Sequence, residues 1–319
     1  MIRYVIRRLI QLIPVILVVS FIVFSLMELA PGNFLDALES EDMTPEARQA
    51  LIEKHNLDRS MFYRFGLYML NLVRGDLGVS DLTQISVWDT FIVRLPNTLL
   101  LAFTSLIFGV AISIPLGVLA ARRAGTLADN AVTLFALVGM SMPIFWLGLL
   151  LLLVFSLQLR WLPTGAFDDG IRSLILPGFC GSLTLMATSA RQTRSNMLEV
   201  LKADYLRTAR AKGVPEEVVV RKHALGNAWI PIITTIGTAI SFQLAGSVVI
   251  ESVFAWPGIG RMAAEAVRAR DVTTATGVII MTTILYVLVQ LIVDLLYAYV
   301  DPRIKARYVS AGKRRRKVA

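Results

Sequence analysis

Cysteine and histidine are almost absent from this sequence of 319 residues. The single cysteine, Cys180, lies in an apolar run and has no second cysteine to pair with, which excludes a disulfide framework and a cysteine-rich metal site. The two histidines, His55 and His223, are far apart in the sequence, so a histidine-based catalytic metal centre has almost nothing to build on. We therefore expect no metal site and no cofactor bound by this chain.

Charge is also scarce. Charged residues make up 17% of the chain and hydrophobic residues 55%, whereas soluble domains are usually about a quarter charged. A phosphate-binding loop of the form G-x-x-x-x-G-K-[ST] is absent too, because the only Gly-Lys pair, Gly312–Lys313, is followed by arginine. The composition predicts a protein that lies in lipid and does not hydrolyse ATP by itself.

Six apolar stretches are long enough to cross a bilayer core as helices, which takes about 20 residues. Gly139, Pro143 and Gly148 predict close packing or a kink in the third stretch. Pro177 and Gly178 interrupt the fourth, which is also the shortest. The sequence therefore predicts an all-α integral membrane protein with six transmembrane helices, at residues 9–29, 98–120, 131–157, 173–190, 230–250 and 274–297.

The first stretch differs from a cleaved secretory signal. The basic start "MIRYVIRR" is similar to one, but the apolar run that follows is longer than a signal peptide needs. The next residues, "ELAPGN", also lack the small-x-small pattern of a cleavage site. We interpret this stretch as an uncleaved first span.

The distribution of basic residues predicts the orientation. With the N-terminus inside, 21 of the 32 lysines and arginines fall in cytoplasmic segments, in agreement with the positive-inside rule. The net charge of +9 is explained by this bias and by the "GKRRRK" tail near anionic headgroups, without nucleic acid. Both termini are therefore expected in the cytoplasm.

Two polar insertions separate the spans. The first, at residues 31–95, is expected outside the membrane and contains a predicted helix, "TPEARQALIEKHNL", with Thr44 as N-cap and Pro45 at the first helical position. The second, at residues 191–229, is expected inside. The predicted regions are 1–30 with the first span, 31–95, 96–190 with spans two to four, 191–229, 230–300 with spans five and six, and the basic tail 301–319.

The inner insertion contains the segment "DYLRTARAKGVPEEVVVRKHALGN", residues 204–227. Its first part predicts a helix that ends at Gly213, a residue suited to a left-handed cap, and Pro215 is expected to begin a second helix. Glu216 and Glu217 fit the positive first turn of that helix, and the basic residues Arg221 to His223 fit its far end. The residues alone leave two interpretations open: an ordinary basic cytoplasmic loop, or a rigid elbow for a partner protein.

Several motifs resemble those of ABC-importer permeases of the dipeptide/oligopeptide/nickel branch, and their order extends over nearly the whole chain. They are "APGN", "LDRSMFYRFGLYMLNLVRGDLGVS", "SMPIFWLGLLLLLVFS" with "WLPTGAF", "RQTRSNMLEVLKADYLRTARAKG", "VFAWPGIGR" and "DLLYAYVDPRIK". The chain departs from the general importer motif E-A-A-x-x-x-G, because Arg207, Thr208 and Ala209 occupy its first three positions and the acidic residue is missing. Asn33 also stands where an acid is common in this branch.

The resemblance implies that the elbow is a coupling loop that docks in a cleft of an ATP-binding subunit. Two such subunits would bind ATP and Mg²⁺, a second homologous permease would complete the pore, and an extracytoplasmic substrate-binding protein would deliver di- or oligopeptides. The implied location is a bacterial or archaeal plasma membrane. The implied coupling residues are Asp204, Tyr205, Arg207, Thr208, Ala209, Arg210, Ala211, Lys212 and Gly213.

Three alternatives remain at this point. The cargo of the same kind of importer would instead be nickel or an oligosaccharide. A secondary transporter would use an ionisable group within the membrane, for which Asp294 and Glu28 are the candidates, although an end-of-span or interhelical role fits Asp294 better. A membrane-embedded enzyme has no support, because the sequence contains no nucleophile elbow and no paired intramembrane aspartates.

Two further sets of residues have two interpretations each. Ser141, Met142, Ser241 and Gln243 either face the translocation path or bond and pack between helices. Trp256, Pro257 and Gly258 form either an outer gate or an interfacial aromatic anchor followed by a turn.

Overall fold

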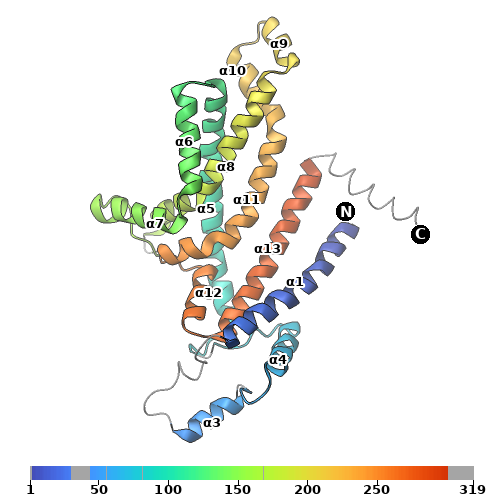
Figure 1. The fold of residues 1–319 in the computed structure, drawn as a ribbon, viewed down its shortest axis with the longest axis vertical. Helices are drawn as coiled ribbons and strands as arrows, with labels where there is room; N and C mark the ends of the chain where they lie inside the picture. The colour runs from blue at the N-terminus through green and yellow to red at the C-terminus, as the bar shows by residue number, and fades with distance from the viewer. Residues whose placement is uncertain (1, 30–43, 55, 81, 168, 301–319) are drawn as a thin grey trace, which may run out of the picture. The chain divides into compact units, whose positions relative to one another are not determined.

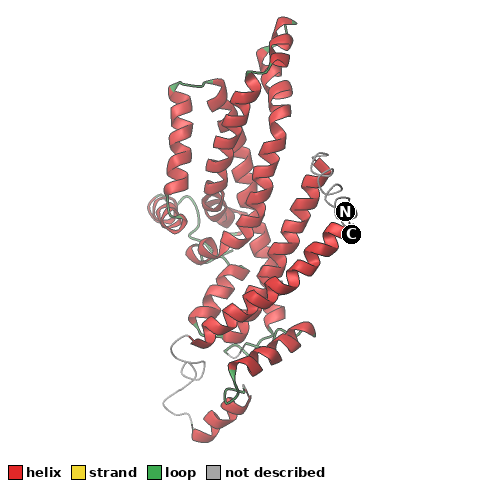
Figure 2. Cartoon of the chain, turned by 45° about the vertical axis from the view of Figure 1, so that its right-hand side comes forward, coloured by secondary structure: helices red, strands yellow, loops and turns green. Residues whose placement is uncertain are grey.

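The computed structural model describes residues 2–29, 44–54, 56–80, 82–167 and 169–300. Within these ranges the regular structure is helical, apart from one isolated antiparallel bridge between Val79 and Ser86 (Figure 2). The chain forms two compact units, which are described separately. The first unit comprises residues 1–98 and 257–288, and the second comprises residues 99–256 and 289–319.

The first unit contains α1 (Ile2–Leu29), α3 (Pro45–Lys54), α4 (Met61–Val73), the start of α5 (Val87–Arg122), α12 (Ile259–Arg268) and most of α13 (Val272–Val300). Helix α3 begins at Pro45, as the sequence predicts. Aromatic rings of α1 and α4 pack together, with Phe21 and Phe65 edge to face at 5.3 Å between ring centroids. The core of this unit consists of Leu77, Val87, Phe91, Ile259, Met262 and Val278.

The second unit is a bundle in which α5, α6, α8 and α11 run side by side (Figure 1). Helix α8 packs against α6, α7 and α11, and Gly117 of α5 lets α5 approach α8 closely. A Cβ atom at Gly117 would lie 2.6 Å from the carbonyl oxygen of Ala190. The elements are α6 (Leu127–Ser141), α7 (Ile144–Leu151), η1 (Leu152–Gln158), η2 (Gly170–Leu174), α8 (Ile175–Leu201), α9 (Asp204–Ala211), α10 (Glu216–Val218), η3 (Val219–Ala224) and α11 (Leu225–Val253).

Four described helices are long and apolar enough to cross a membrane: Leu9–Leu29, Val87–Arg122, Gly170–Leu201 and Val272–Leu296. The fourth predicted span is therefore longer than residues 173–190. Pro177 interrupts nothing because it lies in the first turn of α8, where a missing N–H leaves no intrahelical bond unmade. The fifth predicted span lies within the 29-residue helix α11.

The third predicted span, residues 131–157, is interrupted at Pro143, where the sequence predicts close packing or a kink. Helix α6 ends at Ser141, α7 begins at Ile144, and the two segments are bent by 107°. Pro143 explains the break, because its ring disfavours the helical conformation of the preceding residue. Met142 accordingly has an extended backbone with ψ of 128°. This pair is either a broken span or a re-entrant segment, so the structure has four such helices, or five with the bent pair, among the residues searched.

Candidate coupling site

The candidate site is the turn made by α9 and α10, which projects at one end of the second unit (Figure 1). Helix α9 ends because Gly213 adopts the left-handed conformation, with φ of 75°. The N–H of Gly213 donates to the carbonyl of Arg210 at 2.9 Å, and the N–H of Val214 donates to Ala209 at 3.2 Å. These bonds satisfy carbonyl groups at the end of the helix. The predicted left-handed glycine is confirmed.

The start of the second helix differs from the prediction by one residue. Pro215 has an extended backbone and caps the helix, because its carbonyl accepts the N–H groups of Val218 and Val219 at 2.9 and 3.0 Å. Glu216 and Glu217 then occupy the first turn, as predicted. The expectation that residues 221–223 lie toward the far end of this helix is wrong, since α10 passes through the π-helical segment η3 directly into α11. The basic residues there do not face a helix C-terminus.

Ion pairs brace the turn from both sides of Gly213. Arg210 donates from Nε and Nη2 to the two carboxylate oxygens of Glu216, each at 2.9 Å. This bidentate bond and the attraction of the Arg210 charge hold the pKa of Glu216 below its ordinary value. Glu217 pairs with Arg122 of α5 at 3.0 Å and with Arg221 at 2.5 Å. The turn is therefore tied to the bundle and not only to itself.

One face of α9 anchors it to the second unit. Leu206 is completely buried in a cluster with Val219 and Val220, and Ala209 packs against the same cluster. The side chain of Tyr205 is nearly half exposed, and its hydroxyl accepts a bond from the amide of Asn227 at 3.0 Å. The other predicted coupling residues, namely Asp204, Arg207, Thr208, Arg210, Ala211, Lys212 and Gly213, are exposed.

These contacts refine the expectation for α9. Ala209 faces the bundle, whereas Ala211 is exposed, so of these two alanines Ala211 is the one that a partner could approach closely. Arg210 already binds Glu216, whereas the side chain of Arg207 is 78% exposed and lies 3.7 Å from the carboxylate of Asp204. Leu206 attaches α9 to the second unit. The three-residue spacing between Leu206 and Ala209, which places both on one helix face, is the sequence signal that indicates this buried face.

The predicted path residues lie in different surroundings. Ser141 and Met142 line a groove of about 560 Å³ beside the bend between α6 and α7. The hydroxyl of Ser141 donates to the carbonyl of Leu137 at 2.9 Å. Gln243 of α11 donates to the carbonyl of Gly181 in α8 at 3.0 Å, which joins two helices. The side chain of Ser241 lies outside the described residues.

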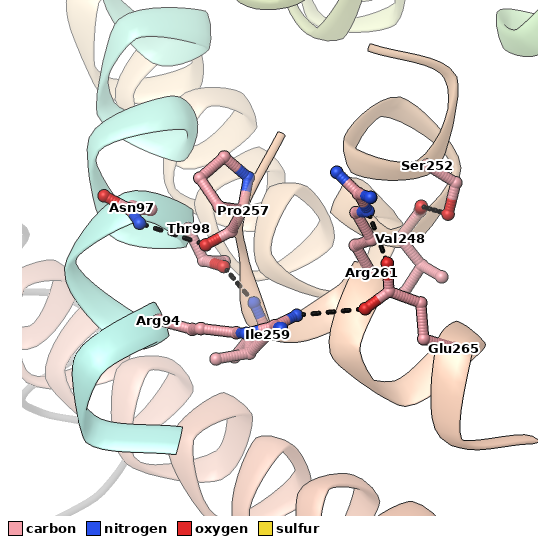
Figure 3. Close-up of polar contacts among 9 residues, drawn as sticks. All are labelled: Arg94, Asn97, Thr98, Val248, Ser252, Pro257, Ile259, Arg261 and Glu265. Atoms are coloured by element: carbon pink, nitrogen blue, oxygen red, sulfur yellow. Dashed lines mark hydrogen bonds and ion pairs between the residues drawn. The ribbon is translucent and has the colours of Figure 1, made fainter. Parts of the chain in front are cut away.

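The predicted gate residues divide between the two units. In the second unit, Trp256 is completely buried and its ring meets that of Phe167 edge to face at 5.3 Å. In the first unit, the carbonyl of Pro257 accepts a bond from Asn97 at 3.0 Å (Figure 3). Gly258 is the N-cap of α12. The N–H of the next residue, Ile259, donates to Thr98 Oγ1 at 2.8 Å.

Helix α12 is held to α5 by a three-member ion cluster. Glu265 accepts from Arg94 at 3.2 Å and from Arg261 at 2.7 Å (Figure 3). Burial raises the pKa of Glu265, but the two arginines lower it by more. The segment after Pro257 is therefore pinned at several points within the first unit.

The ionisable candidates within the spans have partners. Glu28 forms an ion pair with Arg64 of α4. Asp294 accepts a bond from Gln290, one turn earlier on α13, at 3.1 Å. Among the described residues, no group of three or more His, Cys, Asp or Glu side chains is placed to hold a metal ion.

An ion pair in the second unit, between Asp129 and Arg194, was not predicted from the sequence. Asp129 is 2% exposed and binds Arg194 of α8 through two bonds of 2.5 and 2.7 Å, and it also accepts the N–H of Gly125 at 2.9 Å. Sixty-five positions separate the two charges, so no local pattern indicated the pair. It fixes the start of α6 against α8.

Two family models match this chain. The model described as "Binding-protein-dependent transport system inner membrane component" matches residues 113–306, and its N-terminal companion matches residues 1–102. The chain belongs to this family of ABC-importer permeases. The resemblance found in the sequence motifs is thereby confirmed.

Curated relatives of this permease align along nearly their full length. The oligopeptide transport system permease protein AppB of Bacillus subtilis is 39% identical over 315 residues, which covers 96% of this chain and 100% of the relative. The dipeptide transport system permease protein DppB of Escherichia coli K12 is 34% identical over 336 residues, with 96% and 99% covered. A chain of the inward-facing MetNI methionine ABC transporter has the same fold, with a TM-score of 0.55, 20% identity and coverage of 66% of this chain and 96% of that one.

Proposed function

We propose that this permease forms one half of the pore of an ATP-driven importer for di- or oligopeptides. The relatives of this chain support this cargo, since they are an oligopeptide and a dipeptide transport system permease. The proposal does not favour nickel, an oligosaccharide or secondary transport through Asp294. A second homologous permease would complete the pore, and a substrate-binding protein would deliver the peptide.

The function assigned to α9 is docking against an ATP-binding subunit that binds ATP and Mg²⁺. The observation that carries this assignment is the combination of a rigid attachment with an exposed outer face. Leu206 and the Arg210–Glu216 pair hold the helix, while Arg207, Ala211 and Lys212 project outward. A short helix held in this way moves as one body, so closure of two ATPase subunits would be transmitted to α8 and α11.

The proposed arrangement in the membrane has six crossings with both termini in the cytoplasm of a bacterial or archaeal cell. The bent α6–α7 pair would supply the third crossing, and α11 the fifth. Residues 31–95 would face outward as a receiving surface for the binding protein. Part of that region, residues 31–43, and the basic tail 301–319 lie outside the described residues. The path would include Ser141, Met142, Ser241 and Gln243, and residues 256–258 would form its outer gate.

A pull-down combined with an uptake assay tests the proposal. Tagged permease is purified from its own membranes in mild detergent, and the copurifying chains are identified by mass. We expect a second permease and ATP-binding chains with the wild type, and loss of the ATP-binding chains in an Arg207→Glu, Gly213→Val double variant. Arg191→Glu, an exposed charge reversal on α8, is the control and should retain them.

Transport of labelled dialanine and trialanine into cells provides the second readout. Uptake should fall in the double variant and persist in the control. A permease that purifies alone or only with itself would contradict the importer assembly, and uptake of nickel in place of peptide would contradict the cargo.

A further inference from the structure

A groove of about 720 Å³ lies in the second unit between the last turns of α5 and the segment η3. Its floor is apolar and its rim is basic. Four floor residues, Ile114, Pro115, Val118 and Leu119, come from two successive turns of one face of α5, and Val220 and Leu225 come from the opposite wall.

The rim carries three arginines and one carboxylate. Arg122 is the last residue of α5 and Arg123 follows it, Arg221 projects from η3, and Glu217 pairs with both Arg122 and Arg221. The side chains of Arg122 and Arg221 are 40% and 79% exposed. Glu217 engages Nη1 of Arg122 and Nε of Arg221, and each guanidinium has five N–H donors, so both retain donors for another anion. The rim therefore has a net positive charge and open hydrogen-bonding capacity.

The position of the groove along α5 identifies the kind of ligand. Its floor belongs to the apolar helix Val87–Arg122, which is long enough to span a membrane, and its rim begins at the residue where that helix ends. The four floor residues lie in the last turns of the predicted span 98–120, and Arg122 and Arg123 follow it directly, so with the proposed orientation floor and rim meet at the cytoplasmic boundary between hydrocarbon and headgroups. A phospholipid has both chemistries at this spacing.

We propose that this groove binds an anionic phospholipid of the cytoplasmic leaflet, with its phosphate on Arg122, Arg123 and Arg221 and an acyl chain along Val118 and Leu119. Guanidinium groups suit this role because they bind phosphate oxygens in bidentate fashion. The proposal rests on the orientation given under the proposed function. The lipid would share two guanidiniums with Glu217, so it would contact the same ion pairs that tie the α9–α10 turn to α5.

The test measures lipid binding and needs no transport. The full chain, copurified with its partners, is stripped of lipid in a neutral detergent and titrated with palmitoyl-oleoyl phosphatidylglycerol or phosphatidylcholine, with adducts counted by native mass spectrometry. We expect phosphatidylglycerol to bind the permease preferentially. An Arg123→Gln, Arg221→Gln variant should bind it more weakly, by about fivefold for each arginine.

Two further variants separate lipid from other ligands. Leu119→Trp keeps the charges and fills the apolar floor, so it should weaken phosphatidylglycerol but not inorganic phosphate. Arg191→Gln removes an arginine outside the groove and should leave lipid binding unchanged. The proposal is overturned by equal binding of both lipids or by unchanged binding in the double arginine variant. Loss of peptide uptake with intact lipid binding would count against the proposed cargo and not against the groove.

Discussion

Replacing Gly213 with alanine isolates the contribution of a single backbone conformation to the turn between α9 and α10. Nothing lies within 4 Å of a Cβ atom built at Gly213, so the substitution introduces no clash. Its φ of 75° is nevertheless a conformation that costs an L-residue about 1–2 kcal/mol. We therefore expect local opening of α9 to become roughly five- to thirtyfold more frequent.

Gly226 provides the matched control. It also has nothing within 4 Å of a built Cβ atom, but it lies near the start of the helix α11. Alanine there should stabilise the helix by about 0.5–1 kcal/mol. Gly213→Asn gives an intermediate point, because asparagine tolerates the left-handed region better than alanine does.

Hydrogen exchange of the purified complex, followed by mass spectrometry, provides the measurement. Amides of residues 204–212 should exchange faster in Gly213→Ala, less so in Gly213→Asn, and at the wild-type rate in Gly226→Ala. If Gly213→Ala leaves these amides unchanged, or slows them as a helix-stabilising substitution would, the conclusion that left-handed geometry holds the turn is wrong.

Three further predictions concern packing, charge and close approach. Leu206→Ala should destabilise the folded protein by about 2–5 kcal/mol in thermal unfolding, because the side chain is completely buried, whereas Arg207→Ala should change little. The bond from Arg210 lowers the pKa of Glu216 in the folded protein. The stability that this ion pair adds to the folded protein is therefore fully present above pH 4.5 and is lost as the pH falls through the folded-state pKa. The melting difference between wild type and Glu216→Gln should therefore disappear in acid, and a constant difference would refute it. Gly165→Ala should abolish folding, since its Cβ would lie 1.9 Å from the backbone oxygen of Phe254. Gly170→Ala is the control: nothing lies within 4 Å of its Cβ, so it should cost only the backbone strain of a positive φ.

The turn between α9 and α10 shows how far local sequence signals extend. The glycine at 213, the acidic first turn that follows it and the helix before it were all predicted, because caps and helix starts depend on neighbouring residues. Pro215 was misplaced by one position, since both a capping position and a first helical position suit proline. The burial of Ala209 against the bundle was not predicted. It depends on which face of α9 packs against the bundle, and alanine occurs on buried and on exposed faces alike.

The sequence alone determined the first, second, fourth and sixth apolar spans, the family and the absence of a phosphate-binding loop, because long hydrophobic runs and ordered motifs consist of consecutive residues. Tertiary structure alone decided the 107° bend at Pro143, since a proline in an apolar run is compatible with either a kink or a break. It also decided the pairing of Asp129 with Arg194 and the basic rim of the α5–η3 groove. Those features join residues far apart in the chain, and only the packing of helices brings such charges within bonding distance.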